Sequence, residues 1–136
     1  MRILIVDDYI PVMALFAAVL DDDPAHEVDT ATDGREALRK VAAMGYDLVV
    51  MNLRLRETDG PECLSAIRKL RPRQRVLVLV DALDEETAAA LRASGVRPDA
   101  VVVGTRDRKT LVQRIGAALK GPGTQADPEP GNGSAL

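Results

Sequence analysis

Aromatic residues are almost absent from this sequence, which has two tyrosines, one phenylalanine and no tryptophan in 136 residues. It also has one cysteine, Cys63, and one histidine, His26. A disulfide needs two cysteines, and structural zinc sites use several Cys or His ligands, so an internal disulfide and such a zinc site are excluded. Since 46% of the residues are hydrophobic, we expect a core built from Val, Leu, Ile and Ala.

Long apolar runs and a large excess of one charge are missing too. The first apolar run, residues 3–6, stops at Asp7 and is too short for a secretory signal or a membrane span. With 18 basic and 21 acidic residues the net charge is -3, which gives no domain-wide attraction to nucleic acid or to an anionic membrane. We therefore expect a cytoplasmic protein that contacts neither nucleic acid nor membrane directly.

Short apolar runs alternate with segments of helical periodicity over residues 1–120. Apolar runs of four or five residues predict strands, and apolar residues spaced three and four apart predict helices. The predicted strands are 2–6, 27–31, 48–51, 76–80 and 100–103. The predicted helices are 11–20, 34–44, 61–70, 85–94 and 108–119. This alternation predicts an α/β fold with a parallel sheet covered on both faces.

Several helix ends carry local signals. Asp33 followed by Glu36 is typical of a capping box, and Asp84 and Asp107 are expected to cap the last two helices. The pair Asp59-Gly60 predicts a turn before the third helix. That helix is expected to point three residues inward, namely Leu64, Ile67 and Leu70.

The composition changes after Lys120. Residues 121–136 are crowded with glycine and proline and contain almost nothing apolar. Such a segment cannot bury enough apolar surface to fold. We therefore divide the chain into a domain at 1–120 and a disordered tail or linker at 121–136, of natural or engineered origin.

Polar side chains follow three of the predicted strands. Asp7 and Asp8 follow the first, Asn52 the third and Asp81 the fourth. If the sheet has the order 2-1-3-4-5, these strands are neighbours and their carboxyl ends converge where ligands bind in open α/β sheets. A single acid at a strand end is usually a helix cap, but three converging positions predict a site.

Four segments, taken together with their order and spacing, resemble the receiver domain of two-component response regulators. They are residues 2–8, 33–38, 47–60 and 82–86, and the resemblance extends over roughly residues 2–120. It implies a (βα)5 doubly wound, flavodoxin-like fold with a five-stranded parallel sheet of order 2-1-3-4-5. It also implies phosphorelay signalling, in which a histidine kinase phosphorylates one aspartate beside a bound Mg2+.

Compared with that family, the site is degenerate at most positions. Asp7 and Asp8 match the metal-binding acids, but Asn52 stands at the phosphoacceptor position and Asp81 stands where the family has a hydroxyl. Further departures are Gly104 for the lysine, Thr105 for the proline after it, Arg56 for a loop proline and Val101 for the aromatic switch residue. Because a cis bond before Thr105 would cost about 3 kcal/mol, we expect the bond from Gly104 to Thr105 to be trans.

These departures favour an atypical pseudo-receiver that is not an enzyme and signals through protein contacts without phosphorylation of an aspartate. A carboxamide has no anionic oxygen, so Asn52 is a poor nucleophile and a poor Mg2+ ligand. No catalytic residue and no required cofactor are expected, and any Mg2+ at Asp7 and Asp8 should bind weakly.

The residues that remain at the site can form hydrogen bonds and ion pairs with its acids. The amide of Asn52 is expected to donate a hydrogen bond to Asp7 or Asp8. Arg54 or Arg56 is expected to pair with Asp81 or Asp8. For Arg56, a solvent-exposed side chain is the favoured alternative.

In receivers the partner-binding face commonly consists of the fourth helix, the fifth strand and the fifth helix, here residues 84–94, 100–103 and 107–119. Several arginines give this face positive charge, and Val101 lies in its strand. The arginines are Arg92, Arg97, Arg106, Arg108 and Arg114. The expected partner is a sensor kinase, an output domain or a second copy, and a homodimer could form here through bridges from arginines to acids.

Three alternatives stay open. The domain could be the regulatory N-terminal half of a DNA-binding transcription regulator. Asn52 could be an engineered replacement of the acceptor aspartate. An enzyme similar to haloacid-dehalogenase-like phosphatases could use Asp7 or Asp8 as nucleophile, although adjacent acids fit that arrangement poorly and no phosphate loop is present.

Overall fold

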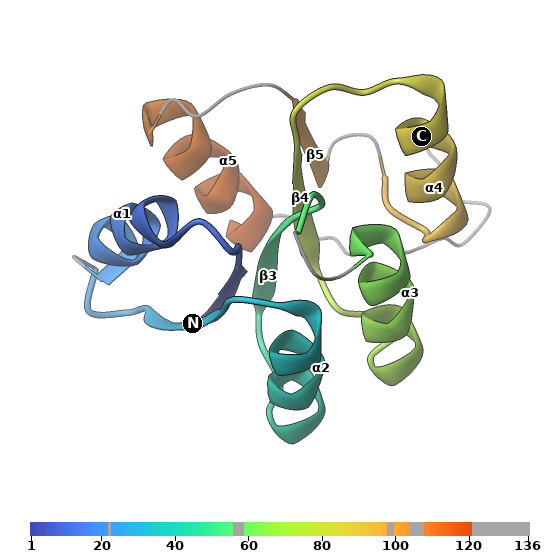
Figure 1. Cartoon of the computed structure of the whole chain (residues 1–136). Coiled ribbons are helices and arrows are strands. Elements are labelled where there is room, and N and C mark those ends of the chain that lie inside the picture. The colour runs from blue at the N-terminus through green and yellow to red at the C-terminus, as the bar shows by residue number, and fades with distance from the viewer. Residues whose placement is uncertain (22, 56–58, 98–99, 104–107, 121–136) are drawn as a thin grey trace.

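The computed structural model describes residues 1–21, 23–55, 59–97, 100–103 and 108–120 (Figure 1). Its strands are β1 (Arg2–Val6), β2 (Glu27–Ala31), β3 (Leu48–Asn52), β4 (Val76–Val80) and β5 (Val101–Val103). Its helices are α1 (Ile10–Asp21), α2 (Gly34–Ala43), α3 (Gly60–Leu70), α4 (Glu85–Ala93) and α5 (Arg108–Lys120). The predicted alternation of strands and helices is therefore confirmed.

The five strands form one parallel sheet in the order β2-β1-β3-β4-β5, as predicted. Val6 lies level with Met51 in the β1–β3 pair, so Asp7 and Asn52 follow at the same height. In the next pair, Asn52 lies level with Leu79. This register brings the polar residues at the carboxyl ends of β1, β3 and β4 to the same end of the sheet.

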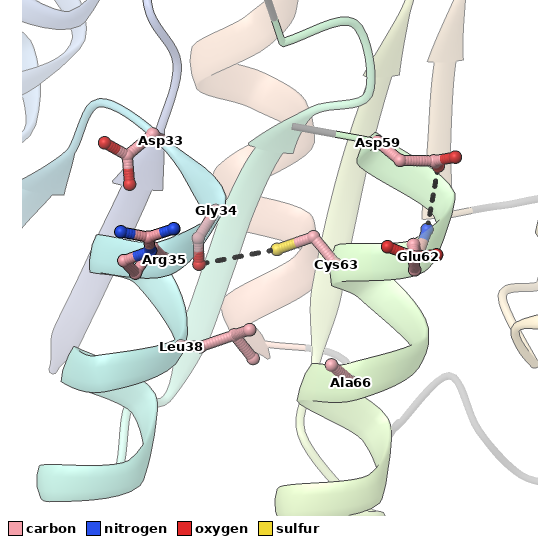
Figure 2. A pocket seen from close by; sticks show the side chains of 8 residues that line it. All are labelled: Asp33, Gly34, Arg35, Leu38, Asp59, Glu62, Cys63 and Ala66. Atoms are coloured by element: carbon pink, nitrogen blue, oxygen red, sulfur yellow. Dashed lines mark hydrogen bonds between the residues drawn. The ribbon is translucent and has the colours of Figure 1, made fainter. Parts of the chain in front are cut away.

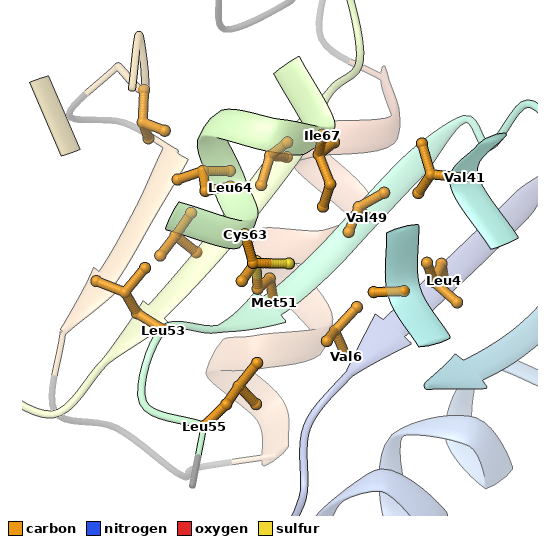
Figure 3. Packing of buried hydrophobic residues seen from close by; sticks show 14 of the residues in the cluster. Leu4, Val6, Val41, Val49, Met51, Leu53, Leu55, Cys63, Leu64 and Ile67 are labelled. Atoms are coloured by element: carbon orange, nitrogen blue, oxygen red, sulfur yellow. The ribbon is translucent and has the colours of Figure 1, made fainter. Parts of the chain in front are cut away.

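Two aliphatic layers cover the sheet, with α1 and α5 on one face and α2, α3 and α4 on the other (Figure 1). Successive residues of a strand point to opposite faces. Accordingly, Leu4 and Val6 pack with α2 and α3 (Figure 3), whereas Ile3 and Ile5 pack with the α1 and α5 layer. The central strands β3 and β4 are buried along their whole length, while the edge strand β2 is mostly half-buried.

The N-termini of the helices follow the capping signals with two differences. The Asp33 side chain accepts from the Glu36 N–H at 2.8 Å. The Glu36 carboxylate accepts from the Thr32 N–H at 2.9 Å, whereas a capping box would have it accept from the N–H of the cap residue. That Thr32 N–H lowers the pKa of Glu36. Asp59, predicted as part of a turn, is the N-cap of α3 and accepts from the Glu62 N–H at 3.0 Å. Asp107 lies outside the described residues.

One predicted core residue is wrong. Leu70 is 49% exposed, because three-residue steps along a helix drift, and Leu70 lies about 120° around the helix from Leu64. The buried positions of α3 are Gly60, Cys63, Leu64 and Ile67.

A substitution at Gly60 tests how closely the start of α3 packs against the loop after β3. A Cβ atom there would lie 1.8 Å from the backbone oxygen of Leu53, and the backbone has little room to move. We expect Gly60→Ala to lower the free energy of unfolding by about 1–3 kcal/mol or more. Urea denaturation, monitored by circular dichroism, measures the free energy of unfolding.

The matched control is Gly116→Ala in α5, where an added Cβ meets no atom of the described residues within 4 Å. Because alanine favours helix over glycine, this change should stabilise the protein by about 0.5–1 kcal/mol. Equal effects of the two substitutions would contradict the close approach at Gly60.

Candidate functional site

Asp7 is buried at the carboxyl end of β1, with 1% of its surface exposed. Its Oδ1 accepts from the Tyr9 backbone N–H at 3.0 Å and from Asn52 Nδ2 at 3.3 Å. Its Oδ2 is buried and has no hydrogen-bond partner among the described residues. The neighbouring Asp8 is half-buried. A buried carboxylate with one unpartnered oxygen is costly, so this end of β1 favours a nearby proton donor or cation.

Asn52, the last residue of β3, uses both ends of its amide. Its Nδ2 donates to Asp7, and its Oδ1 accepts from the backbone N–H of Arg54 at 2.9 Å. Exchanging the amide nitrogen and oxygen would place an oxygen against a carboxylate and an NH2 group against an N–H, so the surroundings define the orientation. The hydrogen bond expected between Asn52 and an acid of the Asp7-Asp8 pair is therefore present.

Arg54 reaches from the loop after β3 to the loop after β4. Its Nε lies 3.4 Å from Oδ2 of Asp81, the residue that follows β4. Both side chains are largely exposed, at 80% and 51%. The expected pairing of an arginine with Asp81 thus falls on Arg54, whereas Arg56 lies outside the described residues.

The side chains available as ligands limit how well a metal ion could bind at this site. Mg2+ prefers a shell of oxygen ligands, usually with at least one or two carboxylates. Asp7 and Asp8 offer two carboxylates, and the unpartnered Oδ2 fits a cation, but Asn52 turns its NH2 group toward Asp7. In the part of the chain that the structure describes, no three His, Cys, Asp or Glu side chains gather as a metal-binding group.

The other predicted positions are only partly described. Gly104, Thr105 and Arg106 lie outside the described residues, and so does the predicted trans bond. Arg108 is the first residue of α5, but its side chain is not among the described ones. Three positions of the predicted face lie on its three elements: Arg92 is exposed on α4, Val101 is half-buried on β5, and Arg114 of α5 donates from Nη2 to the Val101 carbonyl at 3.1 Å.

A cleft of about 510 Å³ opens between the N-terminal halves of α2 and α3 and was not predicted (Figure 2). Its lining combines the two helix caps with Arg35, Glu62, Gly34 and the apolar groups Leu38, Cys63 and Ala66. Burial, followed by the charge of Asp33, raises the pKa of Cys63 to about 11. The thiol is therefore protonated at neutral pH and acts in packing, not as a nucleophile.

No helix in the described part of the chain has both the length and the apolar character needed to cross a membrane.

Comparisons with known proteins agree with the fold and its strand order. The family model "Response regulator receiver domain" matches residues 3–115. The chemotaxis protein CheY of Treponema pallidum is 30% identical over 121 residues, which cover 88% of this chain and 83% of that protein. A protein-glutamate methylesterase/protein-glutamine glutaminase of Nocardioides is 37% identical over 95 residues, and the match spans 69% of this chain but only 26% of that longer protein.

A solved structure gives the same result for the fold. A CheY-like response regulator receiver domain protein of Methanospirillum hungatei superposes with a TM-score of 0.77 at 25% identity, covering 87% of this chain and 92% of that one. The family model covers most of the chain, the curated relative and the solved structure cover nearly all of the folded part, and the sheet has the order 2-1-3-4-5. This chain belongs to the receiver domain family of response regulators.

Proposed function

We propose that this chain is a pseudo-receiver, which keeps the receiver fold and signals through protein contacts without phosphorylation of an aspartate. The observation that carries the proposal is the place of Asn52, at the carboxyl end of β3 with its amide nitrogen 3.3 Å from the buried Asp7 carboxylate. In a receiver, that position supplies the nucleophilic carboxylate oxygen. Here the amide nitrogen is not nucleophilic, and the amide oxygen is neutral and already accepts from Arg54.

The surrounding charges support the same conclusion. Phosphoryl transfer depends on cations that offset the negative charge of the transferred group. Asp81 adds a carboxylate after β4, where the family has a hydroxyl, and position 104 carries glycine in place of lysine. A phosphoryl donor would therefore meet added repulsion and find one cation fewer.

Mg2+ would be held, if at all, by Asp7 and Asp8. When bound, it would supply positive charge to offset these two carboxylates. Two carboxylates without a third anionic ligand make a weak site, so the proposed signalling role does not require a metal. The chain itself is proposed to have no enzymatic activity.

The proposed partner is a protein: a sensor kinase, an output domain or a second copy of this chain. It would dock on the face formed by α4, β5 and α5. Arg92 of this face is exposed, and acids at the start of α4 (Asp84, Glu85 and Glu86) are exposed as well. Two copies could pair through bridges between these opposite charges, giving a homodimer with no direct contact to nucleic acid.

A second candidate is the regulatory domain of a longer protein that also carries a DNA-binding output domain. The observation that favours a multidomain context is the match to only 26% of the Nocardioides protein. The reading frame of the natural gene, examined together with DNA binding by the full product, discriminates this candidate. The same gene sequence shows whether the natural codon at position 52 encodes asparagine or aspartate.

The first prediction from this proposal concerns phosphorylation. After incubation with Mg2+ and acetyl phosphate, intact mass spectrometry of the parent protein should show no phosphoryl adduct, since Asn52 offers no nucleophilic oxygen. An adduct on the parent would contradict the proposal and direct attention to Asp7, Asp8 and Asp81 as acceptors.

The matched variant is Asn52→Asp, treated in parallel. No adduct on either protein would mean that the whole site has lost its chemistry, and regulation would then come from a partner or a ligand. An adduct only on the variant would mean that position 52 alone blocks the reaction, which favours a recent or engineered substitution.

The second prediction concerns stability and pH. Asn52→Asp places a second carboxylate near Oδ1 of Asp7, at a position where the present contact is 3.3 Å. Like charges raise the pKa of one carboxyl in the folded state. The variant should therefore be close to the parent at low pH and lose stability as the pH rises through that raised pKa, reaching a deficit of about 1–3 kcal/mol at pH 7.

Urea denaturation at pH 5 and pH 7 measures this difference. Asn52→Ala is the control, because it also removes the amide donor to Asp7 but adds no charge, so its deficit should depend on pH much less than that of Asn52→Asp. Millimolar Mg2+ should restore stability to the aspartate variant only. A deficit that is equal at both pH values for both variants would argue against direct contact between Asp7 and position 52.

A further inference from the structure

We propose that Arg54 is a positioning residue that ties the loop after β3 to the N-terminus of α4 and so couples Asn52 to the partner face. This inference rests on the proposed function, because it supplies a link between the site and α4 that needs no phosphoryl group. Three observations support the link: the backbone of Arg54 is held in place, an ion pair joins two loops, and α4 has few other contacts with the described residues.

The backbone of Arg54 is held on both sides. Its N–H donates to Asn52 Oδ1 at 2.9 Å, and it forms an isolated antiparallel bridge with Asp59, the N-cap of α3. The preceding residue, Leu53, donates its N–H to the Leu79 carbonyl of β4 at 2.9 Å. The arginine side chain therefore starts from a defined point and has to span only the gap to the next loop.

The side chain reaches the segment that joins β4 to α4. Arg54 Nε lies 3.4 Å from Asp81, at the start of this segment. Asp84, at its end, is the N-cap of α4 and accepts from the Thr87 N–H at 2.8 Å. The Thr87 N–H and hydroxyl lower the pKa of Asp84 most, and the charge of Arg54 adds to this effect. One guanidinium thus acts on both ends of the segment 81–84.

The helix at the end of this link, α4, has few other contacts with the described part of the chain. Of the nine residues of α4, only Leu91 is buried, whereas α2 buries three residues and α3 buries four. Its C-terminal end is attached through Ser94, whose Oγ lies 3.2 Å from that of Ser65 in α3. In Figure 1, α4 lies at the outside of its layer, beside α3. An element with so little buried surface responds most to one added restraint.

Hydrogen exchange of the whole chain, followed by mass spectrometry without a phosphoryl donor, tests the link. Arg54→Ala removes the side chain but keeps the backbone N–H that donates to Asn52 Oδ1. Asp81→Asn removes only the charge of the partner. Because both residues are largely exposed, each substitution should speed exchange of the α4 amides about two- to five-fold. Amides of α2 provide the internal reference and should not change.

Three further variants sharpen the test. The double variant R54A/D81N should exchange no faster in α4 than either single variant, because both remove the same pair. Arg54→Lys should recover part of the protection, since it keeps the charge. Asn52→Ala should also speed exchange in α4, because it frees the backbone at Arg54.

The inference is overturned if α4 exchange does not change in Arg54→Ala, if all helices speed up together, or if the two single effects add. Its failure is separate from that of the proposed function. A phosphoryl adduct on the parent would remove the pseudo-receiver proposal and leave the α4 exchange data standing. Unchanged α4 exchange without an adduct would remove only the role of Arg54.

Discussion

The burial of Asp7 is the constraint on which the rest of the site depends. The parallel sheet is covered by aliphatic side chains on both faces, so a carboxylate at the end of its interior strand β1 is taken almost completely out of water. A buried charge is costly unless a neighbour offsets it. The residue at position 52 of β3, which lies level with Asp7, therefore decides whether the domain needs a bound cation. A carboxylate there would create that need, whereas the carboxamide of Asn52 reduces it.

The carboxamide also changes how the loops are connected. An aspartate side chain can only accept hydrogen bonds when ionised, but Asn52 donates on one side and accepts on the other. It thereby joins β1 to the loop after β3 within one buried group. Arg54 and Asp81 continue the connection to the loop after β4. Hydrogen bonds and an ion pair within this chain thus link the ends of three neighbouring strands.

Much of this arrangement could be predicted from the sequence, because it depends on patterns that local physics enforces. Five apolar runs too short for helices, separated by helix-length segments, leave a parallel sheet as the simplest solution. The strand order that places Asn52 beside Asp7 came from the resemblance to the receiver family. Which arginine pairs with Asp81 was not predictable, because Arg54 and Arg56 have the same charge and differ only in how the loop turns. The cleft between α2 and α3 was missed for a similar reason. It arises from the separation of two helices, and no local motif reports that distance.

The strength of the Arg54–Asp81 pair limits what kind of signal such a domain can give. An exposed ion pair contributes about 0.2–1 kcal/mol, which shifts a two-state equilibrium by at most about five-fold. Moving a population from 1:99 to 99:1 requires about 5.5 kcal/mol. The pair can therefore bias the position of α4 but cannot fix it. A partner that shifted α4 to a second position would have to supply the rest through unequal affinities for the two positions. A receiver without phosphorylation would thus report how much partner is bound, with Arg54 setting the concentration at which α4 responds.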